Sequence, residues 1–229
     1  MMTDNLIALI LARIITLFPN YLSLLKKLEI GVFFFCWRCY LEARSLPAYY
    51  GRLDENLKEQ AVSEYNHAQV FCQLTGSKLN MSGAGLMSRE EKQAWEWSFV
   101  KWDSSNESYQ VDGMSTRYLS ARIFFGFRTA NSYDWCDRLA FMCVLEDFQH
   151  CFYKQLAFFV PPEVQEKLLP IIEDELTHAI NLHACLWLIA GVKRSSHLLL
   201  IWQIRKYLAL ICIPVDALKF VVGNLKSFV

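Results

Sequence analysis

The stretch Glu175-Leu176-Thr177-His178 places a carboxylate and an imidazole three residues apart in a segment with helical periodicity. Residues at that spacing lie on one face of a helix, so both side chains can reach a single ion. The segment Glu64-Tyr65-Asn66-His67 repeats the pattern earlier in the chain. One such pair is weak evidence, but two pairs, each preceded by a lone glutamate on the preceding helix, predict a two-metal site.

The second pair has its lone glutamate in Glu146, which lies 29 positions before Glu175. Midway between them stands Val160-Pro161, and Pro161-Pro162 must interrupt a helix there. Two antiparallel helices that meet there place both carboxylates roughly 20 Å from the turn at about 1.5 Å per residue, and therefore level with each other. We predict one helix from 132 or 134 to 159, and another from 163 to 190 that is closed by Gly191.

The first pair is matched in the same way by Glu42. Glu42 and Glu64 are symmetric about Leu53, close to a turn at Gly51. We predict short helices over 4–18 and 21–29, a long helix over 31–44, and another over 55–75 with Asp54 as its N-cap. Glu29 and Glu59 fit the pattern less well than Glu42, being off the expected face or badly spaced.

The candidate metal ligands are Glu42, Glu64, His67, Glu146, Glu175 and His178. Four bare carboxylates inside an apolar bundle would be very costly. Two divalent iron ions would make the cluster formally neutral, and oxygen and imidazole ligands suit iron and manganese. The expected cofactor is therefore a pair of iron ions, with manganese or a mixed manganese–iron pair as alternatives.

This ligand set resembles that of the ferritin-like diiron-carboxylate superfamily, over about residues 31–191. The 29-residue spacing is also similar to that of cyanobacterial aldehyde-deformylating oxygenases, although the first hairpin is shorter and the crossover longer. The resemblance implies an all-α, ferritin-like four-helix bundle, made of two helical hairpins joined by a long crossover. It also implies dioxygen activation, with Glu64 and Glu175 as bridging, catalytic carboxylates.

We expect one domain over residues 1–229, with the bundle at 31–191 and accessory helices at 1–30 and 195–229. The apolar segment 198–222 is interpreted as two short helices, with peripheral membrane contact as an open alternative. A formal net charge of zero argues against non-specific nucleic-acid binding. The eight cysteines lie in apolar helical patterns, which favours reduced thiols and a cytoplasmic location.

The function expected from these observations is oxidation or oxygenation of a small hydrophobic substrate. Electrons would come from an external donor such as a ferredoxin-type reductase, because no flavin or nicotinamide motif is present. Two alternatives stay open: a ferroxidase or metal-binding protein without an organic substrate, and a non-catalytic helical protein held on membranes by its termini. A homodimer is also compatible with the sequence.

Several residues near the expected site have two interpretations. His150 is more simply a hydrogen-bonded core histidine than a ligand, and Cys39 in Cys36-Trp37-Arg38-Cys39 more simply a structural thiol. Asp147 and Asp174 are candidates for orienting a ligand histidine. The tryptophans at 95, 97 and 102 predict a lid over the bundle or the wall of a substrate channel.

Overall fold

The computed structural model is almost entirely helical and describes residues 2–47, 50–77, 101–103, 108–110, 119–128 and 130–225. The helices are α1 (Met2–Thr16), α2 (Tyr21–Ala43), α3 (Leu53–Leu74), α6 (Leu119–Phe124), α7 (Trp135–Leu156) and α8 (Pro162–Leu225), with a 3₁₀ turn at Ala130–Ser132. Two of the tryptophans predicted to form a lid or channel wall, Trp95 and Trp97, lie outside the described residues.

One feature of the fold differs from the expected all-helical chain. Two three-residue strands, β1 (Lys101–Asp103) and β2 (Ser108–Gln110), form an antiparallel pair between α3 and α6. Trp102 pairs with Tyr109 in this hairpin. The all-α prediction is confirmed for the rest of the described chain.

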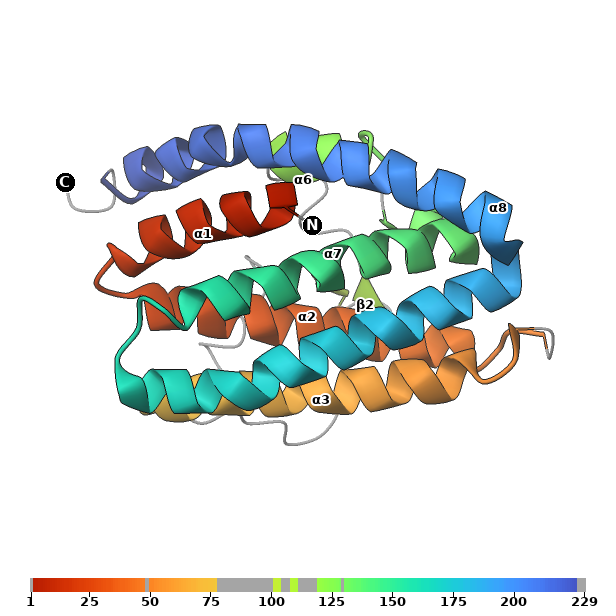
Figure 1. Ribbon diagram of the computed structural model, residues 1–229, viewed down its shortest axis with the longest axis horizontal. Coiled ribbons are helices and arrows are strands. Elements are labelled where there is room, and N and C mark those ends of the chain that lie inside the picture. Colours follow the sequence, from red (N-terminus) through yellow and green to blue (C-terminus); the bar gives the residue numbers. More distant parts are fainter. Residues whose placement is uncertain are drawn as a thin grey trace.

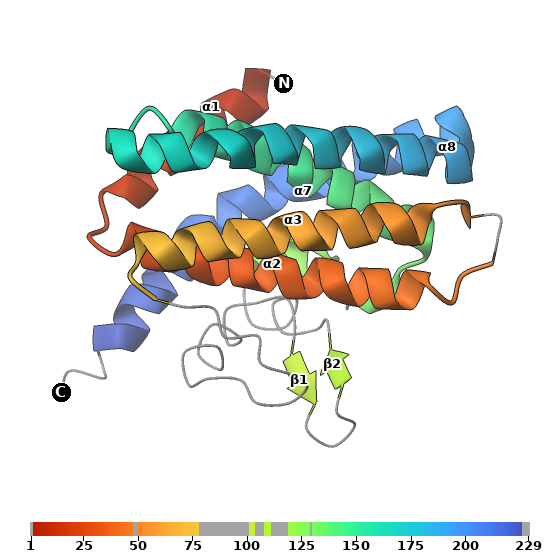
Figure 2. The same ribbon diagram turned by 90° about the horizontal axis from the view of Figure 1, so that it is seen from below.

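Helices α2, α3 and α7 and residues 162–190 of α8 lie side by side in both views of the structure (Figures 1 and 2). We call them the four helical segments. Helix α2 packs along α3, α7 packs along α8, and α3 contacts α8 between the two pairs. Helix α1 lies on α7, and α6 packs on α8. The long crossover between α3 and α7 therefore joins two pairs of adjacent helices.

Helix α2 runs without a break from Tyr21 to Ala43, and the predicted division into two helices at Gly31 is wrong. A glycine inside a helix costs about 1 kcal/mol relative to alanine, which the packing of a long buried helix can offset. Gly31 is itself buried within α2. The consequence for the site is large, because Glu29 belongs to a long inner helix and not to an accessory one.

Helix α8 consists of two arms that meet at Gly191, and we call this junction the elbow. Gly191 has φ 72° and ψ 159°, a conformation that ends the helical hydrogen-bonding pattern. The first arm, 162–190, runs beside α3 and α7, and the second arm, 192–225, turns back across α7 (Figure 1). The second arm is one helix that contains Pro214, so the prediction of two short helices there is wrong.

Asp134 shows why α7 begins where it was expected to begin. Its backbone is extended, and its side chain accepts a hydrogen bond of 2.9 Å from the backbone N–H of Asp137. This N-cap satisfies a donor that the first turn of the helix leaves free. The start of α7 is therefore set by a local sequence signal.

Two groups of buried apolar side chains meet in the middle of the four helical segments. On α2, Leu25 belongs to one group and Phe33 to the other. The same change of group occurs on α7 between Cys143 and Tyr153 and on α8 between Ile171 and Leu182, whereas α3 contributes Ala61, Ala68 and Cys72 to one group and Phe71 to the other. Glu146 on α7 and Glu175 and His178 on α8 lie at this boundary.

The elbow gives a direct test of the fold. The φ and ψ of Gly191 fall in a region that only glycine occupies readily, and strain there costs of order 1–3 kcal/mol. We expect Gly191→Ala to lower the free energy of unfolding by about that amount, measured by urea denaturation. Val192→Ala, at an exposed neighbouring position, should change it by less than about 0.5 kcal/mol. Equal stabilities for the two variants would contradict the strained elbow.

Candidate metal centre

Five of the six predicted ligands converge in the interior of the protein. Their exposed fractions are 0% for Glu64, 2% for His67, 3% for Glu146, 0% for Glu175 and 7% for His178. A sixth residue, Glu29 at 1% exposure, joins them from α2. They form two overlapping groups whose ligand atoms all lie within 4.8 Å of one another: Glu29, Glu64, His67 and Glu175; and Glu64, Glu146, Glu175 and His178.

The first group surrounds the Nδ1 atom of His67. Nδ1 lies 3.3 Å from Oε2 of Glu64 and 3.4 Å from Oε1 of Glu175. Oε2 of Glu29 lies 3.8 Å away. Three carboxylates from three helices therefore face one imidazole nitrogen.

The second group surrounds Nδ1 of His178 in the same manner. Nδ1 lies 3.3 Å from Oε1 of Glu64, 3.6 Å from Oε2 of Glu146 and 3.9 Å from Oε2 of Glu175. Glu64 and Glu175 thus offer one carboxylate oxygen to each imidazole. Two ions held beside these imidazoles would therefore share Glu64 and Glu175 as ligands.

The buried polar atoms without a hydrogen-bond partner are concentrated at this centre. Among the described residues eight such side-chain atoms occur, and the only one outside the cluster is Nδ1 of His183. The other seven are Oε2 of Glu29, both carboxylate oxygens of Glu64, Nδ1 of His67, Oε2 of Glu146, Oε2 of Glu175 and Nδ1 of His178. Buried polar groups are nearly always paired, so seven atoms that face a common centre fit a set of metal ligands.

Glu42 lies away from the cluster, which corrects its predicted place in the ligand set. Its carboxylate binds Arg38 at 2.8 Å on the same helix and Arg138 on α7, and it is partly exposed. The reason is its position one residue before Ala43, the end of α2. It is therefore level with the start of α3 and not with Glu64, which lies 11 residues beyond Leu53.

Glu29 is the member of the cluster that the sequence interpretation set aside in favour of Glu42. It lies 14 residues before Ala43, and His67 lies 14 residues after Leu53, so the two are level in antiparallel helices. The signal was present in the spacing. It was hidden because the turn between the helices was placed at Leu53, whereas α3 already begins there.

Polar side chains outside the cluster hold its members in place. Asp174 lies 3.0 Å from Nε2 of His67, the nitrogen that faces away from the cluster. Tyr153 donates a hydrogen bond to Oε1 of Glu29, and Gln60 donates one of 2.6 Å to Oε1 of Glu146. Such partners fix the orientation of metal ligands and often change metal affinity 10–100-fold when removed.

The other residues with two interpretations are now placed. Nδ1 of His150 is 2.9 Å from the backbone oxygen of Ile172, the contact of a core histidine. Asp147 binds His183 at 3.0 Å and no ligand histidine. All eight cysteines are free thiols. In the Cys-x-x-Cys pair, burial is the largest cause of the raised pKa of Cys36, and the negative charges of Glu64 and Glu146 are the next largest.

Protons balance the buried charges in the metal-free cluster. Burial, reinforced by the charge of Glu64, raises the pKa of Glu29 to about 8. Burial and the charges of Glu64 and Glu146 raise the pKa of Glu175 well above its usual range.

Unlike Glu29 and Glu175, the side chains of Glu64, His67 and His178 are stabilised in their charged forms. Burial opposes their charged forms, but attraction between them prevails, so the pKa of Glu64 falls to about 2. The pKa rises to about 9 for His67 and about 10 for His178. Without metal, imidazolium protons therefore supply positive charge that the carboxylates require.

Comparison of the chain with protein-family models, with curated proteins and with solved structures finds no match. The resemblance to the ferritin-like diiron superfamily therefore rests on the ligand pattern of this chain.

The assignment of Glu29, and not Glu42, to the cluster can be tested by measuring the metal content of two variants. We expect Glu29→Gln to lower the metal bound from two ions per chain to about one, because the group around His67 loses a carboxylate. Glu42→Gln should keep two ions, since that carboxylate binds arginines. Inductively coupled plasma mass spectrometry on both variants gives the ratio. Loss of metal in Glu42→Gln alone would contradict the assignment.

The pKa values predict how metal binding depends on pH. The pKa values of Glu29, His67 and His178 are about 8, 9 and 10, so these three side chains hold protons at pH 7. Ligands must be deprotonated, so binding releases protons and affinity rises with pH. Isothermal titration calorimetry with manganese(II) should show a binding heat that changes with the ionisation enthalpy of the buffer. A heat that is the same in every buffer would contradict this.

Proposed function

We propose that this chain is a diiron-carboxylate oxidoreductase that activates dioxygen. In this proposal α2, α3, α7 and the first arm of α8 form a ferritin-like four-helix bundle around the metals. The observation that carries the proposal is the convergence of seven unpaired, buried oxygen and nitrogen atoms from four helical segments on one centre. Such a set of groups is costly to bury unless cations bind it.

The ligands divide between two metal positions. Glu29 and His67 would hold one ion, Glu146 and His178 the other, and Glu64 and Glu175 would bridge both, as their shared distances to the two imidazoles suggest. Two divalent ions against four carboxylates and two neutral imidazoles make a neutral centre. Bound in the reduced state, iron at these positions would supply electrons to dioxygen.

The surrounding residues orient the ligands and keep water out. Asp174 fixes the ring of His67, and the hydroxyl of Tyr153 holds Glu29. The two groups of apolar side chains close the centre from both ends of the helices. This setting favours a small hydrophobic substrate.

The oxidation needs an electron source outside this chain, because the sequence contains no flavin or nicotinamide motif. We propose an external donor such as a ferredoxin-type reductase. The eight free cysteines are compatible with a reducing, cytoplasmic compartment.

Iron loading and dioxygen consumption test the proposal together. Purified protein reconstituted anaerobically with ferrous iron should hold two ions per chain and consume dioxygen when a chemical reductant is supplied. Glu175→Ala should hold less than one ion and lose dioxygen consumption at least about 100-fold, because both positions lose a bridging ligand. The matched control is Glu173→Ala, two residues away on the same helix and exposed. Full iron content and turnover in Glu175→Ala would refute the metal centre.

A second measurement separates an oxygenase or oxidase from a ferroxidase. Repeated dioxygen consumption that a long-chain aldehyde or fatty-acyl compound stimulates supports turnover of an organic substrate. Consumption limited to the iron added, with no response to these compounds, would mean that ferrous iron is itself the substrate.

A further inference from the structure

The outward face of the second arm of α8 is apolar from Leu198 to Asp216. Between Leu198 and Asp216, every exposed residue is apolar: Leu200, Ile204, Leu208, Ile211, Pro214 and Val215. The exposed fraction is 50% for Leu208 and 73% for Ile211. Apolar residues at three- and four-residue intervals form a continuous stripe on a helix. This stripe faces away from the protein.

Helix α1 continues the apolar surface. Leu6, Ile10 and Ile14 are 58%, 50% and 47% exposed and share one face of the helix. Helix α1 and the second arm both lie over α7 in Figure 1, and they meet where Asp4 contacts Gln203 and Lys206. The two stripes therefore belong to one side of the molecule.

The inward face of α1 carries small side chains, and a charged pair lies between α1 and the second arm. Ala8 and Ala12 are fully buried on α1, and the ion pair between Asp4 and Lys206 is buried between the segments. A helix on the surface of a water-soluble protein has the opposite polarity, with its apolar stripe directed inward. Large apolar residues outward with small and paired charged residues inward are typical of helices that face lipid.

Length and composition agree with this polarity. Residues Pro162–Asp216 of α8 are long and apolar enough to cross a membrane, a criterion that core helices of soluble proteins also meet. The second arm, however, buries Trp202 and Lys206 completely or nearly so against the rest of the protein. One face of the segment is thus covered by protein, and only the opposite face is available to lipid.

The exposed charges of this side are basic. The acidic residues of α1 and of residues 192–216 are Asp4 and Asp216, and both are buried. Asp216 is also engaged by the backbone N–H groups that start α6. Lys193 and Arg194 are exposed at the elbow.

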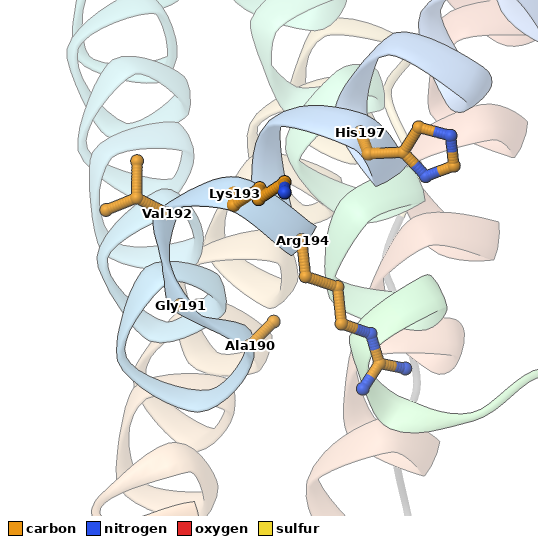
Figure 3. A pocket seen from close by; sticks show the side chains of 6 residues that line it. All are labelled: Ala190, Gly191, Val192, Lys193, Arg194 and His197. Atoms are coloured by element: carbon orange, nitrogen blue, oxygen red, sulfur yellow. The ribbon is translucent and has the colours of Figure 1, made fainter.

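Figure 3 shows the basic end of this surface. Lys193, Arg194 and His197 extend from the start of the second arm and line an open depression together with Ala190, Gly191 and Val192. Arg194 also binds Asp134 at 3.0 Å. The exposed apolar residues Leu188 and Val192, at 75% and 72%, adjoin Lys193 and Arg194. A basic cluster beside exposed aliphatic side chains is complementary to an anionic lipid surface.

We propose that α1 and the second arm of α8 form a membrane-docking face that lies flat on an anionic lipid bilayer. The apolar stripes enter the boundary between headgroups and acyl chains, and the elbow contacts the phosphate groups. The buried faces of both segments stay against the protein, so the chain rests on the bilayer without crossing it. This docking goes beyond the proposed oxidation and does not require an active metal centre.

Vesicle co-sedimentation of the full, iron-loaded chain tests the docking face. We expect wild-type protein to bind vesicles of phosphatidylcholine mixed with phosphatidylglycerol, and Leu208→Glu to bind at least about tenfold more weakly. The matched control is Val62→Glu on α3, which has the same 50% exposure as Leu208. It should bind as the wild type does. Equal binding by Leu208→Glu and wild type would overturn the proposal.

The basic elbow makes a separate prediction. Lys193→Gln should weaken binding to the anionic vesicles about fivefold, and leave binding to vesicles of phosphatidylcholine alone unchanged. An equal effect on both lipids would overturn the role of the elbow in recognising anionic headgroups.

Two further readouts separate lipid docking from loss of the metal centre and from self-association. Iron content should stay at two ions per chain in Leu208→Glu, so failure of docking and failure of the metal centre give different results. Analytical ultracentrifugation checks for a second copy on the same face. A wild-type dimer that ignores vesicles and that Leu208→Glu dissociates would show that protein, and not lipid, covers this surface.

Discussion

Four carboxylates and two imidazoles buried between four helical segments are the constraint on which the rest of this structure depends. Each group on its own would be costly to remove from water. Together they are tolerable only if the negative charge is matched at close range, by protons in the metal-free chain or by cations. The pKa values of about 9 and 10 for His67 and His178 express this requirement directly.

The packing around the cluster follows from that requirement. On α2, α7 and the first arm of α8, the buried apolar residues change from one group to the other at the level of the ligands. Polar residues that touch the ligands, such as Gln60 and Tyr153, are buried and bonded. Glu42, which lies outside the cluster, forms an ion pair with Arg138. The interior thus has one polar layer between two apolar ones.

Much of this arrangement could be predicted from the sequence because its signals are local or symmetric. The two Glu-x-x-His pairs and Glu146 were identified from spacing, and Pro161 fixed the turn between the second pair of helices. The first pair of helices has no comparable marker. Gly31 suggested a boundary inside α2 where packing maintains a helix. The symmetry of Glu42 and Glu64 put the turn later than it is, which favoured Glu42 over Glu29.

Other features depend on contacts between distant segments. The choice of Asp174 and not Asp147 as the partner of a ligand histidine is set by how α3 lies against α8. Sequence indicated that Gly191 ends a helix, but the direction of the next helix is a property of the whole fold.

The sharing of Glu64 and Glu175 has a consequence for how the centre fills. Each carboxylate gives one oxygen to either position. A single bound ion would leave the second oxygen of both residues without a partner, in a setting where unpaired charge is costly. In the proposed centre, the first ion would also align both shared carboxylates for the second. Filling of the two positions would therefore be cooperative, with little of the half-filled form between the empty, protonated state and the doubly filled one.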